Sequence, residues 1–128
     1  MGIFDKLLGN NKGTMESAIP WINLTDKAQL ADLALVSAAQ PVLIFKHSTR
    51  CGISRMVLKQ FEKEYNFDES QLQPYFLDLL NHRDISNAIA ERFSVVHESP
   101  QILVIKSEKC VFDASHHEID AIALQDKI

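Results

Sequence analysis

Short apolar runs alternate with amphipathic segments along most of this chain, and the alternation limits the folds that it can adopt. The clearest run, residues 42–47 (VLIFKH), is continuously apolar and turns polar at its end. Such runs suit strands that are buried on both faces, as in a sheet covered by helices. Four further strands are predicted, at residues 21–25, 74–80, 101–106 and 110–114.

The segments between these strands carry apolar residues at helical spacing, which predicts amphipathic helices. Thr25 and Asp26 are typical N-cap residues for the first helix, and Ser115 is predicted to cap the last one. The four apolar faces comprise Leu30, Leu33 and Ala34; Ile53, Val57, Leu58 and Phe61; Ile85, Ala88, Ile89 and Phe93; and Ile119, Ile122 and Ala123.

The predicted element order is β-α-β-α-β-α-β-β-α. Strands that alternate with helices imply a central α/β sheet flanked by helices, and the closing hairpin makes this sheet mixed. The chain has 128 residues, the size of one domain. We expect residues 1–13 to be a flexible N-terminal segment and residues 14–128 to form the domain.

Charge and hydropathy argue against two classes of partner. The formal net charge is −4 and no basic stripe is visible, so no nucleic-acid partner is predicted. No apolar run approaches the roughly 20 residues that cross a bilayer, so we predict no membrane association. Cys51 and Cys110 are the 2 cysteines and make no disulfide framework. Without a secretory signal, we expect a reducing cytoplasm.

Cys51 lies where the strand over residues 42–47 gives way to a predicted helix. Free N–H groups and the positive end of the helix dipole favour an anion at such a junction, and Arg50 adds a positive charge. The thiolate is the attacking form of cysteine, so this position predicts a nucleophile. Gly52 lacks a side chain and leaves room for a partner to approach the sulfur.

Ser54 lies one helical turn beyond Cys51, where a second cysteine would resolve a mixed disulfide. A hydroxyl cannot form a disulfide but can hydrogen-bond the thiolate, so the sequence favours chemistry with one thiol. Ser54 can also be only a first-turn helix residue. Cys110 begins the predicted returning strand, so we expect it at the far end of the sheet in a structural role. No metal site is predicted at His47, His116 or His117.

The segment FKHSTRCGIS at residues 45–54, followed by ESPQ at 98–101, resembles the YtxJ-like monothiol bacilliredoxins of the thioredoxin-fold superfamily. The resemblance covers residues 21–128 and implies a thioredoxin-like fold. It implies that Cys51 is the redox nucleophile and that Ser54 replaces the resolving cysteine. Phe45 stands where dithiol thioredoxins carry a buried acid, which a protein without a second cysteine does not need.

The resemblance also implies a substrate site. Pro100 matches the cis-proline that faces the active site, and the backbone of Ser99 would pair with a substrate chain. Thr49 and Gly52 are predicted to bind the substrate as well. The expected activity is removal of a low-molecular-weight thiol, bacillithiol or a similar small thiol, from S-thiolated client proteins. A second thiol or a dithiol partner would then restore Cys51, with no metal or other cofactor.

Two other functions remain open. CGIS is similar to the CGFS motif of monothiol glutaredoxins, which carry an iron–sulfur cluster with glutathione. Those proteins have a valine before the proline and a Gly-Gly segment near the last helix, whereas this chain has Ser99 and ASHHE at residues 114–118. The other alternative is a non-catalytic interaction module, which needs no reactive thiol.

Overall fold

The computed structural model describes residues 19–128, so the predicted segment over residues 1–13 lies outside the described part. The elements in chain order are β2 (Ile22–Asn23), α1 (Gln29–Ser37), β3 (Val42–His47), α2 (Gly52–Glu64), β4 (Gln73–Asp78), α3 (Arg83–Phe93), β5 (Gln101–Lys106), β6 (Lys109–Ser115) and the 3-10 turns η1 (His116–Glu118) and η2 (Ala123–Asp126). No helix among them is long and apolar enough to cross a membrane.

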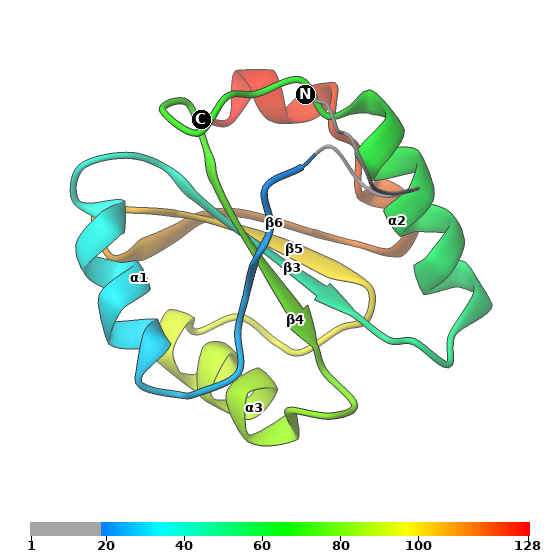
Figure 1. The fold of residues 1–128 in the computed structure, drawn as a ribbon, viewed down its shortest axis with the longest axis horizontal. Helices are drawn as coiled ribbons and strands as arrows, with labels where there is room; N and C mark the ends of the chain where they lie inside the picture. The colour runs from blue at the N-terminus through cyan, green and yellow to red at the C-terminus, as the bar shows by residue number, and fades with distance from the viewer. Residues whose placement is uncertain (1–18) are drawn as a thin grey trace, which may run out of the picture.

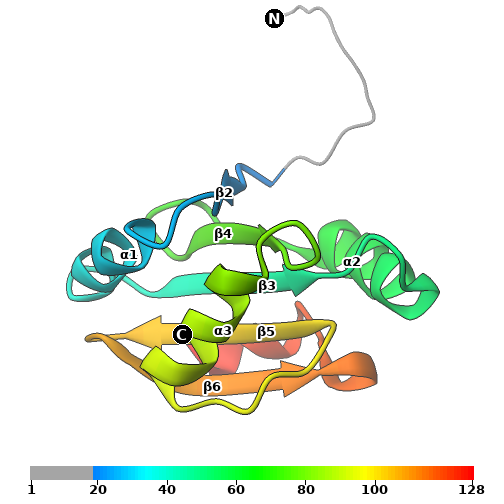
Figure 2. The same ribbon diagram turned by 90° about the horizontal axis from the view of Figure 1, so that it is seen from below.

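The strands form one mixed sheet in the order β2-β4-β3-β5-β6, which Figure 2 shows from top to bottom. β4 pairs in parallel with β2 and with β3, whereas β5 is antiparallel to both β3 and β6. Every residue of the central strand β3 is buried. The α/β fold class and the doubly buried strand over residues 42–47 are therefore confirmed.

Helices cover both faces of the sheet, because successive side chains of a strand point to opposite faces. Figure 1 shows α1 and α3 on one side of the strands and α2 with the C-terminal segment on the other. Ile44 of β3 belongs to the core beneath α1 and α3, and Phe45 belongs to the core beneath α2. The fully buried residues Leu33 and Ile89 anchor α1 and α3, and Phe61 anchors α2.

Rings from two strands, one helix and the residue before β2 fill the core beneath α2. The Phe45 ring centroid lies 6.0 Å from that of Trp21, 5.3 Å from Phe61 and 6.3 Å from Phe76. Trp21 also donates through Nε1 to Glu62 Oε2 at 3.0 Å, which ties the residue before β2 to α2. Phe45 occupies an apolar site that could not hold a carboxylate without a large cost.

The prediction of one closing helix from Ser115 is wrong. The segment consists of the two 3-10 turns η1 and η2 instead. His116 has φ 55°, which an α-helix does not accommodate, and its N–H donates to Pro100 O at 3.0 Å. Ile122 is 59% exposed, so it does not face the core, although its spacing from Ile119 suggested a buried helix face.

The predicted helix starts also need correction in detail. Asp26 Oδ1 accepts the Ala28 N–H at 2.8 Å, so Asp26 caps the turn that precedes α1 rather than α1 itself. In α2 the first inward residue is Ser54, which is fully buried, whereas Ile53 is 46% exposed. The apolar stripe predicted that Ile53 would face the core, but Ser54 faces the core in this turn instead.

Candidate redox site

Cys51 lies in the loop that joins β3 to α2 and is the N-cap residue of α2. Its backbone is extended, its N–H donates to Ser48 O at 3.2 Å, and its carbonyl accepts the Arg55 N–H at 3.1 Å. The side chain is half-buried and carries a free thiol. The predicted position at a strand-to-helix junction is confirmed, so the free N–H groups of the first turn lie nearby.

Ser54 joins the first turn of α2 to the end of β3. Its Oγ accepts the Ser48 N–H at 3.1 Å and lies 2.8 Å from His47 Nδ1. Because Oγ already accepts one hydrogen bond, its own proton can be donated to a neutral His47 ring. Burial lowers the pKa of His47, which favours that neutral ring. Within residues 19–128, the hydrogen bonds of the Ser54 hydroxyl go to His47 and Ser48 and not to Cys51.

Replacing Ser54 with alanine should destabilise the fold by about 1–3 kcal/mol, because the buried Ser48 N–H and His47 Nδ1 lose their partner. Urea unfolding followed by circular dichroism measures the effect. Ser70→Ala is the control, since the Ser70 hydroxyl bonds Asp68 on the exposed surface and its loss should cost under about 0.5 kcal/mol. Equal losses for both variants would contradict a structural role for the Ser54 hydroxyl.

Arg55 is a site residue that the sequence analysis missed. Its Nη1 donates to Thr49 O at 3.1 Å, and its Nη2 lies 3.9 Å from where a Cβ on Gly52 would stand. The guanidinium therefore folds back along the Cys51 loop, while the predicted charge, Arg50, is exposed. The spacing of four residues between Cys51 and Arg55 could have revealed this contact, because residues four apart share one face of a helix.

A surface hollow of about 800 Å³ runs along α2 beside the cysteine loop. Arg55 and Lys59 supply positive charge to it, and Ile53 and Met56 supply apolar surface at 46% and 65% exposure. Its other lining residues are His47, Gly52 and Leu58. Gly52 is exposed and has no close neighbour besides Arg55, so the approach to this loop is open.

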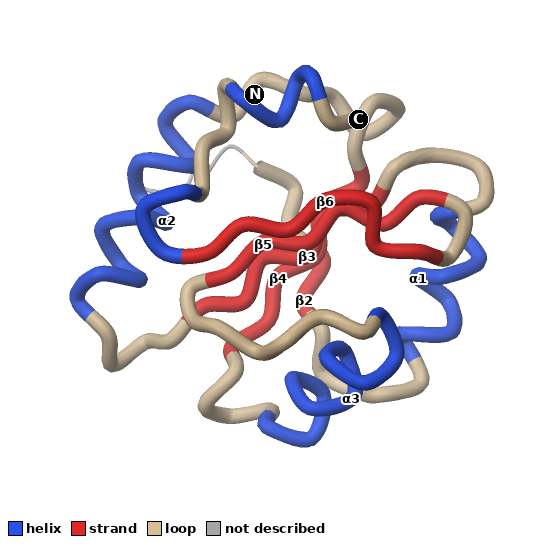
Figure 3. Tube along the Cα trace, turned by 180° about the vertical axis from the view of Figure 1, so that it is seen from behind, coloured by secondary structure: helices blue, strands red, loops and turns tan. Residues whose placement is uncertain are grey.

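Ser99 and Pro100 reach the same edge of the sheet as the cysteine loop. Gln101, the first residue of β5, pairs with Lys46, the residue before the last in β3. Figure 3 shows the loop from α3 to β5 running along the sheet toward the end at which α2 begins. The Ser99–Pro100 bond is cis, as predicted. Ser99 Oγ is buried and has no hydrogen-bond partner within the described residues.

Cys110 lies at the opposite end of the sheet from Cys51. It pairs with Ile105, which in turn pairs with Val42 at the start of β3, whereas Cys51 follows the end of β3. Cys110 Sγ lies 3.3 Å from Phe112 O, and burial raises the pKa of its thiol. The predicted separation of the two cysteines is confirmed.

Histidines and carboxylates do not gather into a metal-binding group in the part of the chain from residue 19 onward. No three His, Cys, Asp or Glu side chains there lie where they could hold one ion. His116 Nε2 approaches Glu98 Oε1 at 3.6 Å, and both side chains are about half exposed.

Comparison with solved structures agrees with this architecture. A thioredoxin-fold protein described as a candidate oxidoreductase is 28% identical, with a TM-score of 0.70, over 82% of this chain and 90% of that one. Thioredoxin from Malassezia sympodialis is 16% identical, with a TM-score of 0.66, over 88% of this chain and 91% of its own. Thioredoxin from Trypanosoma brucei brucei is also 16% identical, with a TM-score of 0.62, over 88% and 92%.

The likeness to the two thioredoxins shows a thioredoxin-like fold for this chain. A family model gives the narrower assignment, because the model described as monothiol bacilliredoxin BrxC matches residues 22–124. That match spans every strand from β2 to β6, the Cys51 loop and the Ser99–Pro100 segment. With one free thiol at the helix start and a buried serine one turn beyond it, this thioredoxin-fold protein belongs to the monothiol bacilliredoxin family.

Proposed function

We propose that this protein removes bacillithiol from mixed disulfides on client proteins, using Cys51 as its one exchanging thiol. The observation that carries the proposal is the arrangement around Cys51. A half-buried free thiol stands at the start of α2, and the position one turn on holds a serine bonded to His47 and Ser48. The other cysteine, Cys110, is at the far end of the sheet.

The proposed reaction proceeds by two exchanges. The Cys51 thiolate attacks the bacillithiol sulfur of the client disulfide, the client sulfur leaves as a thiolate, and a Cys51–bacillithiol disulfide forms. A second bacillithiol thiolate then attacks the bacillithiol sulfur of that adduct. This step releases bacillithiol disulfide and restores the Cys51 thiolate, so electrons balance without a metal. A dithiol partner can replace the second bacillithiol.

The surrounding residues have proposed roles in this scheme. Arg50 and the first turn of α2 assist the exchange at Cys51, and Ser54 holds that turn in place instead of resolving the adduct. Thr49 and Gly52 border the approach to the sulfur, and the backbone of Ser99 beside Pro100 pairs with the client chain. We place the reaction in a reducing cytoplasm, where free thiols persist.

Incubation with oxidised bacillithiol should give one stable adduct per chain, because Ser54 cannot release it. Intact-mass spectrometry measures the adduct, and a single-cysteine reporter protein carrying bacillithiol measures removal. Cys51→Ser should abolish both signals, whereas Cys110→Ser should leave both unchanged. Oxidised glutathione in place of bacillithiol tests which small thiol is preferred.

Three results would argue against the proposal. A Cys51–Cys110 disulfide in the native monomer would contradict the single-thiol scheme. Iodoacetamide alkylation of Cys51 no faster than that of Cys110 would favour a non-catalytic interaction module. A stoichiometric coloured cluster after anaerobic incubation with iron, sulfide and glutathione would favour a cluster carrier.

A further inference from the structure

Lys46 is a fully buried lysine beside the proposed redox site. It lies one residue before His47 in β3, and its side chain is 0% exposed. The register places it between Leu77 of β4 and Gln101 of β5. Lysine is almost never fully buried unless it is paired, and the exchange chemistry proposed above gives this residue no role.

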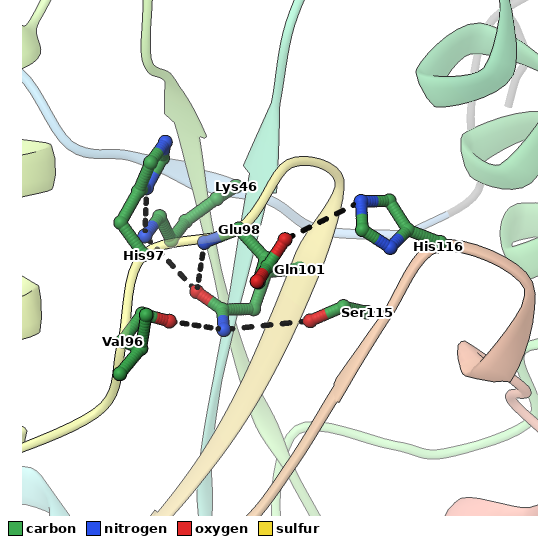
Figure 4. A network of polar contacts seen from close by, with 7 residues as sticks. All are labelled: Lys46, Val96, His97, Glu98, Gln101, Ser115 and His116. Atoms are coloured by element: carbon green, nitrogen blue, oxygen red, sulfur yellow. Dashed lines mark hydrogen bonds and ion pairs between the residues drawn. The ribbon is translucent and has the colours of Figure 1, made fainter.

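Two neutral groups bind the amine of Lys46. Its Nζ lies 2.7 Å from His97 Nδ1 and donates to Gln101 Oε1 at 3.0 Å, as Figure 4 shows. An ammonium group only donates, so His97 accepts through Nδ1 and carries its proton on Nε2. Ser86 Oγ of α3 lies 3.3 Å from the same Nδ1. Lys46 therefore binds the two side chains that flank residues 98–100.

Gln101 extends the contact to the rest of the loop. Its Nε2 donates to Val96 O at 3.0 Å and lies 3.5 Å from Ser115 Oγ of β6. Its Oε1, which accepts from Lys46, also lies 3.4 Å from the Glu98 N–H. The segment from Val96 to Gln101 is thereby fastened to β3 on one side and to β6 on the other (Figure 4).

We propose that Lys46 is a positioning residue for the exchange, because its buried amine fixes His97 and Gln101 and thereby the Ser99–Pro100 segment between them. The inference rests on the proposed function, in which that segment pairs with the client chain. Lys46 itself touches no reacting atom. Its effect should therefore appear in the use of protein substrates and not in the intrinsic reactivity of the Cys51 thiol.

A purely structural role explains this lysine poorly. Burying a charge costs free energy, and well-packed apolar residues in place of buried charges are often neutral or stabilising. Methionine has a similar length and would fill the site without a charge. Lys46 contacts two neutral groups at the base of one loop. Its contacts therefore explain how that loop is held in place, whereas they do not explain a gain in stability.

The test compares Lys46→Met with Lys106→Met, which lies at the other end of the antiparallel strand β5. Steady-state kinetics use the full chain and a single-cysteine reporter protein that carries bacillithiol as a mixed disulfide. Lys46→Met should lower kcat/KM for the reporter at least tenfold, mainly through a higher KM. Iodoacetamide alkylation of Cys51 should change less than twofold, and the thermal midpoint should not fall. Lys106→Met should match the wild type.

Two results would overturn the inference. One is a kcat/KM for Lys46→Met within twofold of wild type, and the other is an equal loss of alkylation and exchange. If Lys46→Met does not fold, His97→Ala provides the second variant, because His97 is exposed and its loss releases one side of the segment. His97→Ala should also raise KM for the reporter, and an unchanged KM would overturn the inference. A wild-type protein that cannot act on the reporter would instead contradict the proposed function.

Discussion

Phe45→Asp should leave this protein unfolded at neutral pH. The Phe45 side chain is 0% exposed and its ring contacts the rings of Trp21, Phe61 and Phe76. Truncation of a buried phenylalanine costs about 3–5 kcal/mol, and an unpaired buried carboxylate costs several more. Domains have only about 5–15 kcal/mol of stability in total. Far-ultraviolet circular dichroism and urea unfolding measure the result.

Ile122→Asp is the matched control for that experiment. It introduces the same charge in the same half of the molecule, but Ile122 is 59% exposed, so the cost should stay within about 0.5 kcal/mol. A cooperative unfolding transition for Phe45→Asp near that of the wild type would show that the core tolerates an acid. The expected outcome means that the buried acid of dithiol thioredoxins cannot be added here by one substitution.

Lys46→Met should make the protein more stable, and the gain should shrink as the pH rises. Burial lowers the pKa of Lys46 from 10.5 to about 8. Below pH 8 both the folded and the unfolded chain carry the proton, so the wild type bears the full penalty of a buried charge. Between pH 8 and 10.5 the unfolded chain binds more protons than the folded chain, so wild-type stability rises with pH.

The size of this pH effect follows from the shift in pKa. At about 1.4 kcal/mol per unit, the difference in unfolding free energy between variant and wild type should shrink by about 3 kcal/mol from pH 7.5 to above pH 10.5. Urea titrations of both proteins across this range measure it. Lys106→Met, at the opposite end of β5, is the control for replacing a lysine by methionine and is measured at the same pH values. A constant gain for Lys46→Met would mean that Lys46 keeps an ordinary pKa.

The strands that consist of continuous apolar runs were predicted correctly from the sequence. The strand over residues 42–47 and the strand over residues 101–106 match β3 and β5 residue for residue. Cys51 at a helix start and the cis bond before Pro100 were also predicted correctly. The strands and the helix start follow from short runs of residues, whereas the cis bond was implied by the family resemblance.

One feature that the sequence did not predict depends on partners far along the chain. The role proposed for Lys46 rests on His97 and Gln101, 51 and 55 residues away, and strand pairing alone brings them together. Ser54 differs, because its partners His47 and Ser48 are near in sequence but lie on the preceding strand and loop. The closing helix failed because apolar spacing cannot show that Ile122 faces solvent.

The aromatic rings beneath α2 include a tryptophan, which gives this protein an intrinsic fluorescence probe. Trp21 is the 1 tryptophan of the chain, so all indole fluorescence comes from one place. Its ring stacks on Phe61 of α2 at 6.4 Å and lies 5.3 Å from Phe76 of β4, and its N–H is bonded to Glu62. Trp21 therefore contacts both the sheet and α2, the helix that begins directly after Cys51. Its emission therefore reports, without a dye, on any movement of α2 against the sheet.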